Sequence, residues 1–70
     1  MIPLNFASLN EVNVIKKISG TKEIKEHLQS LNLRVGSRVT IVNTVGADLI
    51  LSVEDSRVAI SKELAEKVMI

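Results

Sequence analysis

The chain contains no cysteine, no tryptophan and no tyrosine, and Phe6 is its only aromatic residue. Without cysteine, neither a disulfide framework nor a thiolate metal site can supplement the core. With one phenylalanine, the chain also lacks the aromatic platforms on which proteins that bind single-stranded nucleic acids stack the bases. Its three glycines, Gly20, Gly36 and Gly46, are isolated and form no phosphate-binding loop.

The chain also has little excess charge. Nine lysines and arginines oppose eight aspartates and glutamates, which gives a formal net charge of +1. A strongly basic balance is typical of domains that bind nucleic acid, so this composition argues against such a partner. No apolar run approaches the ~20 residues that span a bilayer, and the N-terminus lacks the pattern of a signal peptide. We therefore expect a cytoplasmic protein that does not insert into a membrane.

What the chain does have is aliphatic residues: hydrophobic residues make up 46% of its 70 positions. A chain of this length buries only about 60% of the surface that it exposes when unfolded, so its stability depends on few contacts. We expect one small domain over residues 1–70. Within residues 1–8, Ile2, Leu4 and Phe6 alternate with small or polar residues, which predicts an N-terminal arm or an edge strand.

The stretch from Thr21 to Leu31 has the spacing of an amphipathic helix. Ile24, Leu28 and Leu31 recur at the i, i+4, i+7 positions of one helical face, so this face should be buried. Gly20 ends the preceding segment in a turn. The Thr21 hydroxyl can accept a hydrogen bond from the first free N–H groups, which makes Thr21 the expected N-cap.

Asn32 is expected to end this helix in the left-handed conformation, because asparagine adopts it more readily than other residues except glycine. Leu33 should then fold back onto the helix as the hydrophobic contact that accompanies such a cap. Gly36 marks a second tight turn before the next strand.

Five stretches have the alternation or the β-branched content of strands, at residues 9–18, 38–44, 49–53, 57–60 and 68–70. Adjacent Val14 and Ile15 interrupt the alternation of the first, which indicates a bulge or burial on both faces. The link around Gly46 is expected to be a loop longer than a two-residue turn. Residues 54–56 form a second turn.

A brief helical turn should follow Ser61, whose hydroxyl can cap it, with Leu64 and Val68 on its apolar side. The apolar C-terminus is expected to pair beside the first strand. Together the elements predict a mainly β fold, a small and partly open β-barrel of about five strands. One α-helix lies between strands 1 and 2, and a short helical turn precedes the last strand.

Several motifs in this order resemble those of a known family. The pieces are Leu9, Ile18-Ser19-Gly20, residues 28–36 with leucine at 28 and glycine at 36, Val58-Ala59-Ile60 followed by Glu63, Leu64 and Ala65, and the apolar end at 68–70. Their combination resembles the ferrous iron transport protein A (FeoA) family across nearly the whole chain. Asn32 stands where that family usually has glycine, and the segment between Val12 and Ile15 is shorter than usual.

The resemblance implies an SH3-like barrel in the cytosol, without a cofactor or enzymatic activity. It also implies a role as an accessory to the membrane ferrous iron transporter of the FeoB type, which carries a GTP-binding domain. The same barrel resembles the C-terminal domain of metal-dependent repressors of the diphtheria toxin repressor type. An alternative function is therefore a metal-responsive regulatory domain that binds Fe²⁺ or another divalent ion, although no helix-turn-helix precedes it here.

His27 is the only histidine, and with Glu23 it forms an i, i+4 pair that could hold a divalent ion. Metal sites usually supply three or four ligands, so a partly covered histidine at the edge of the helix is the preferred interpretation. No motif places a nucleophile and a buried acid beside His27, which argues against an enzyme.

Five cations, Lys16, Lys17, Arg34, Arg38 and Arg57, could gather into a basic patch. Because the aromatic platforms for nucleic acid are absent, solvated strand faces or contact with an acidic protein partner are the favoured interpretations. Exposed apolar residues could add a docking patch for a protein partner. The candidates for such partner binding are Leu31, Leu33, Arg34, Val35, Met69 and Ile70. An open sheet edge would be a further surface, through which two copies of the chain could associate.

Overall fold

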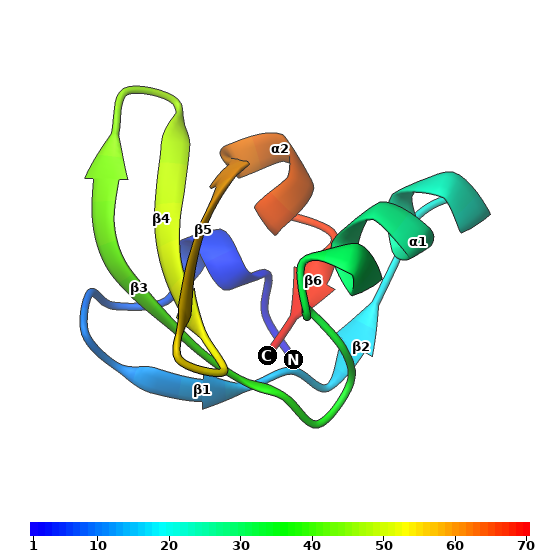
Figure 1. The fold of residues 1–70 in the computed structure, drawn as a ribbon, viewed down its shortest axis with the longest axis horizontal. Helices are drawn as coiled ribbons and strands as arrows, with labels where there is room; N and C mark the ends of the chain where they lie inside the picture. The colour runs from blue at the N-terminus through cyan, green and yellow to red at the C-terminus, as the bar shows by residue number, and fades with distance from the viewer.

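The computed structural model describes residues Met1–Ile70, which form two β-sheets and two α-helices around one core. The elements, in chain order, are a 3₁₀ helix η1 (Leu4–Phe6), β1 (Val12–Val14), β2 (Lys17–Ile18), α1 (Lys22–Ser30), β3 (Arg38–Val45), β4 (Asp48–Val53), β5 (Ser56–Ser61), α2 (Lys62–Ala65) and β6 (Val68–Met69). One sheet has the strand order β1-β3-β4-β5, and the other pairs β2 with β6. Figure 1 shows β3, β4 and β5 on one side of the molecule and β2 and α1 on the other.

The four-stranded sheet is antiparallel throughout and has one apolar face turned inward. Val39 and Ile41 of β3 are buried, while Thr40 and Val42 are half-buried on the other face, as the alternation predicts. The same alternation buries Leu49, Leu51 and Val53 of β4. One extra residue, Val42, sits between the partners of Leu51 and Ile50, so β3 contains a bulge there.

The hairpin between β3 and β4 differs from its prediction. Val45 pairs directly with Asp48, so the link is the two-residue turn Gly46-Ala47, and the expectation of a longer loop was wrong. Gly46 has φ of +59° while Ala47 has no positive φ, which is the pattern of a type II′ turn. Val45 belongs to β3 because it pairs with Asp48 of β4. The local sequence does not reveal this pairing.

The next hairpin turns at Glu54-Asp55, within the predicted turn. Both residues have positive φ, +47° and +65°, and Val53 pairs with Ser56. Two consecutive left-handed residues define a type I′ turn, in which Asn-Gly is the usual pair. Neither residue here is glycine, so the turn carries local strain.

The opening stretch 9–18 forms two strands in two sheets. Val14 is exposed at the end of β1, while Ile15 is buried in the core. β1 pairs with β3, and β2 pairs with β6, so the adjacent Val14 and Ile15 mark the point at which the chain passes from one sheet to the other. This transfer explains why alternation fails there.

Helix α1 begins and ends as predicted. The Thr21 hydroxyl accepts a hydrogen bond from the Ile24 N–H at 3.2 Å. At the other end, Asn32 is left-handed (φ +66°), its N–H donates to Gln29, and the Leu33 N–H donates to the Leu28 carbonyl at 3.0 Å. These two bonds form a Schellman motif, which returns the buried Leu33 to the core beside Leu28.

The two ends of the chain pair with each other. The Ile2 N–H donates to the Ile70 carbonyl at 2.9 Å, and the Ile70 N–H donates to the Ile2 carbonyl at 2.8 Å. Figure 1 shows the N- and C-termini side by side. Pro3 bridges to Met69, and the chain then turns into η1, which buries Leu4 and leaves Phe6 exposed. The C-terminal segment thus pairs with the second part of the opening stretch, in β2, and also with the N-terminal residues.

Ser61 caps α2 by accepting a hydrogen bond from the Leu64 N–H at 3.1 Å. Ala65, rather than Leu64, is the fully buried residue of this turn, and Val68 is buried beyond it. The core contains 13 residues and no buried polar residue; its members are Leu4, Ile15, Leu28, Leu33, Val39, Ile41, Leu49, Leu51, Val53, Ile60, Ala65, Val68 and Ile70. No helix in the structure combines the length and the apolar content needed to cross a bilayer.

Candidate functional site

One cavity of about 400 Å³ opens on the surface between β2, α1 and the loop that follows α1. Its lining is Lys16, Lys17, Ile18, Lys25, Gln29, Leu33, Arg34 and Val35. Four of these eight residues are cations, three are aliphatic and none is acidic. We call this cavity the basic groove.

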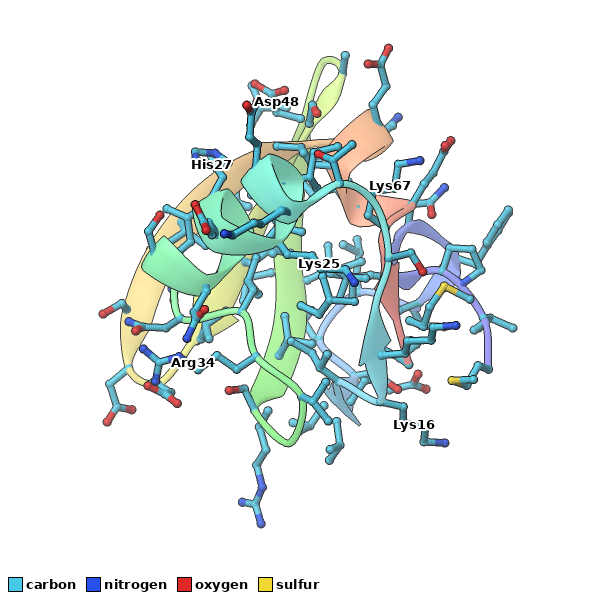
Figure 2. The ribbon with its side chains drawn as sticks, turned by 90° about the vertical axis from the view of Figure 1, so that its right-hand side faces the viewer. Lys16, Lys25, His27, Arg34, Asp48 and Lys67 are labelled. Carbon is cyan, nitrogen blue, oxygen red and sulfur yellow. The ribbon has the colours of Figure 1, made fainter.

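The four cations of the basic groove have no carboxylate partner. The molecule contains one salt bridge, between Lys22 and Glu26, and it lies outside the groove. Lys16, Lys17, Lys25 and Arg34 are all exposed. In Figure 2, Lys25 lies between α1 and β2, Lys16 lies beyond the lower end of β2, and Arg34 lies below the C-terminal end of α1. A protein with a formal net charge of +1 therefore concentrates four positive charges at one opening.

Backbone pairing determines where the groove begins. The Ile15 N–H donates to the Ser37 carbonyl at 2.9 Å, and the Gly36 N–H donates to the Ile15 carbonyl at 2.8 Å. No backbone hydrogen bond joins Lys16–Ile18 to residues 33–35. The two segments diverge after Ile15, and the groove occupies the space between them.

The cap of α1 places the second wall of the groove. Left-handed Asn32 turns the chain so that Leu33 enters the core while Arg34 and Val35 remain at the surface. The Asn32 Oδ1 also accepts a hydrogen bond from the Arg34 guanidinium at 3.4 Å. On the opposite side, Gly20 (φ +109°) links β2 to α1, and a Cβ there would lie 3.2 Å from the Ile24 Cγ2. The positive φ favours glycine at this link, and a Cβ there would also require Ile24 to shift by a few tenths of an ångström.

The predicted partner patch is only partly at the surface. Val35 is 66% exposed and Arg34 is exposed, and both line the basic groove. Leu31 and Met69 are half-buried. Leu33 and Ile70 belong to the core, so their assignment to an exposed docking patch was wrong. Their burial follows from the Schellman motif and from the pairing of the chain ends.

The predicted cations separate into two groups. Lys16, Lys17 and Arg34 line the groove, whereas Arg38 and Arg57 lie on the outer face of the four-stranded sheet. The structure adds Lys25, which the sequence interpretation of this patch omitted. Lys25 lies on the polar side of α1, and only the orientation of the helix against β2 brings it to the other cations.

Glu23 and His27 are both exposed on α1. In Figure 2, His27 lies on the opposite side of this helix from Lys25. No group of three histidine, aspartate or glutamate side chains comes together in a way that could hold a metal ion. The pair therefore gains no further ligand from the fold.

The structure also exposes apolar side chains that the docking prediction omitted. Met1, Ile2, Phe6 and Leu9, at the N-terminal end of the chain, are each between 49% and 72% exposed. The one available signal in the sequence was Phe6, the only aromatic residue, in a segment that was expected to lie at an edge.

Comparison with known proteins gives a consistent family. The family model of the FeoA domain matches residues 2–70 of this chain. A protein of Methanocaldococcus jannaschii, provisionally named Fe(2+) transport protein A, is 31% identical over 70 residues, which are 100% of this chain and 85% of that protein.

Two solved structures are similar. A crystal structure of an iron uptake regulatory protein, FeoA, has a TM-score of 0.89 and 29% identity, covering 97% of this chain and 90% of that one. The Stenotrophomonas maltophilia FeoA, solved with zinc and described as an SH3 domain protein, has a TM-score of 0.84 and 21% identity, covering 99% of this chain and 88% of that one. The second likeness confirms the predicted SH3-like fold.

Proposed function

Because this chain belongs to the FeoA family, a family of non-enzymatic accessory proteins of ferrous iron transport, we propose that it acts by binding another protein of that transport system. The proposed partner is the membrane ferrous iron transporter, contacted on its cytoplasmic side at or near its GTP-binding domain. Binding would alter iron uptake or the GTP-linked cycle of the transporter.

The basic groove is the observation that carries this proposal. It combines unpaired cations with the aliphatic side chains of Ile18 and Val35, while Leu33 closes it from the core, and it contains no nucleophile or general acid. Such a surface is suited to binding another molecule, because cations steer an acidic partner and aliphatic groups add contact area. The exposed apolar residues near the N-terminus offer a second surface for protein contact.

The experiment is capture of the purified cytoplasmic domain of the transporter by this protein, with GDP, with a non-hydrolysable GTP analogue and without nucleotide. We expect capture in at least one nucleotide state and a change in the rate of GTP hydrolysis when the two proteins are mixed. An unrelated small acidic protein serves as the bait control. Absence of capture in all three states would contradict the proposal.

A metal-responsive regulatory function is the alternative. It would have to use Glu23 and His27, which lie one turn apart on the exposed side of α1 without a third ligand from the fold. Titration with Fe²⁺ under anaerobic conditions, or with Co²⁺, discriminates between the two functions. A metal-responsive domain would show tight binding and a rise in melting temperature that His27→Gln abolishes. The proposed accessory function predicts neither.

A further inference from the structure

We infer that the basic groove binds an acidic segment of a partner polypeptide in an extended conformation, laid along the open edge of β2. This inference rests on the proposed function and deepens it, because it names the surface of this protein and the chemistry of the segment that it recognises. Three independent features of the groove support it.

The first feature is charge. Lys16, Lys17, Lys25 and Arg34 come from three separate parts of the chain, and none of them is neutralised by an acidic side chain. Their mutual repulsion is relieved when carboxylates approach, and cations concentrated at one opening attract anions over a distance comparable to the Debye length. The occupant must therefore supply several negative charges.

The second feature is the backbone. β2 pairs with β6 on one side only, and the hydrogen bonds that join the preceding Ile15 to the loop do not continue into β2. Beyond this point the other edge of Lys17–Ile18 has no strand beside it. An extended peptide can add to such an edge through main-chain hydrogen bonds, which is a recurring mode of peptide recognition.

The third feature is the aliphatic part of the lining. Val35 is 66% exposed, and Ile18 lies on the facing wall. A free phosphate would gain nothing from these side chains, and the groove has a single arginine for bidentate contact. Alternating residues of an extended peptide place acidic groups toward the cations and branched aliphatic groups toward Val35. The expected recognition pattern is thus alternation of glutamate or aspartate with valine, isoleucine or leucine.

The test uses the full chain and a short fluorescein-labelled peptide of alternating glutamate and valine, with binding measured by fluorescence anisotropy at several salt concentrations. We expect saturable binding that weakens as salt rises. The matched control peptide replaces each glutamate by glutamine and should not bind. Unlabelled peptide should displace the probe, whereas inorganic phosphate at the same ionic strength should not.

Two double variants locate the site. Lys25→Gln/Arg34→Gln removes two charges from the groove, one from α1 and one from the loop that follows it, and Arg57→Gln/Lys62→Gln removes two exposed charges outside it, so both lower the net charge by the same amount. We expect the groove variant to bind the glutamate peptide about tenfold more weakly, since exposed ion pairs each contribute a few-fold, and the control variant to stay within about twofold. Circular dichroism and melting temperature confirm that both variants fold.

Equal losses in the two variants would overturn the inference, because they would show only the effect of net charge. Equal binding of the glutamine peptide, or displacement by phosphate, would overturn it as well. The same variants separate this inference from the proposed function. If the groove variant still captures the transporter domain, the groove assignment fails while the accessory function stands. If the peptide binds the groove but no transporter domain is captured, the proposed accessory function fails while the groove remains a site for an acidic peptide.

Discussion

The four-stranded sheet and the basic groove are both built from extended backbone, but the strands of the sheet are paired with one another and the segments that line the groove are not. In the sheet, pairing is continuous across β1, β3, β4 and β5, and the inward side chains are buried aliphatic residues. At the groove, pairing stops after Ile15, the two segments diverge, and exposed cations without partners line the opening.

The difference shows how a chain of 70 residues separates stability from recognition. A small core leaves few contacts to spare, so the completed ladder and the aliphatic face must supply most of the folding free energy. The groove can then keep unpaired charge and open backbone edges, since neither is required for folding. Changes in the sheet should therefore affect unfolding, and changes in the groove should affect binding.

The largest expected effect comes from the buried face of the sheet. Leu51 lies in the interior strand β4 and is 0% exposed. Leu51→Ala should lower the free energy of unfolding by about 2–5 kcal/mol, because it removes buried methyl groups and leaves a cavity. Urea titration measures this change, with Val45→Ala at an exposed position of β3 as the control. A loss below about 1 kcal/mol would show that the sheet is not the main source of stability.

Asn32 tests the junction between the two regions. Asn32→Val should cost about 2 kcal/mol, because a β-branched residue is strained in the left-handed conformation. Asn32→Gly should be neutral or slightly stabilising, although it removes the hydrogen bond to Arg34. Thermal denaturation of the two variants compares them directly. If they melted together, left-handed strain would not explain why this position ends the helix.

The Glu54-Asp55 turn tests whether the sheet retains strain that a better turn can remove. Glu54→Asn/Asp55→Gly should raise the free energy of unfolding by about 1 kcal/mol, because Asn-Gly favours the two positive φ angles of this turn. The substitution also removes an exposed hydrogen bond of 3.5 Å from the Ser37 hydroxyl to Glu54, whose contribution is small. Urea titration measures the gain, and a loss of stability would indicate that the native acidic pair is needed there.

The smallest effect on folding should come from the groove. Lys25→Gln/Arg34→Gln should change the free energy of unfolding by no more than about 0.5 kcal/mol, as is usual for exposed side chains outside special contacts. Neither cation forms a salt bridge that the substitution could break. Urea titration beside wild type gives the comparison. A loss as large as that of Leu51→Ala would remove the distinction between the two regions.

Much of the fold could be predicted from the sequence because its signals are local. The spacing of Ile24 and Leu28, the hydroxyl of Thr21 and the left-handed tendency of Asn32 all act within a few residues of one another. Strand ends are different, because pairing with a distant segment decides them. The extension of β3 to Val45 and the division of the opening stretch into β1 and β2 were therefore beyond local patterns, although Gly46 at the first position of the turn was a local signal for a tight hairpin.

The candidate site was less predictable for a related reason. Apolar character alone does not distinguish the buried Leu33 from the exposed Val35, since a left-handed residue before them decides which side chain turns inward. Lys25 joins Lys16 and Lys17 only through the packing of α1 near β2. The sequence supplied the residues, and the tertiary arrangement decided which of them meet.

The reciprocal hydrogen bonds between Ile2 and Ile70 make the polypeptide almost a closed ring. A short glycine linker could join the two ends, and a new opening could be cut at the exposed tip Gly46-Ala47, which Figure 1 shows on the opposite side of the molecule from β2 and α1. We expect such a circularly permuted chain to keep the same strand order in space. In the permuted chain, the linker that joins the original ends is an internal segment held at both sides. A fluorophore or a fused protein attached to this linker would therefore not hang on a flexible tail.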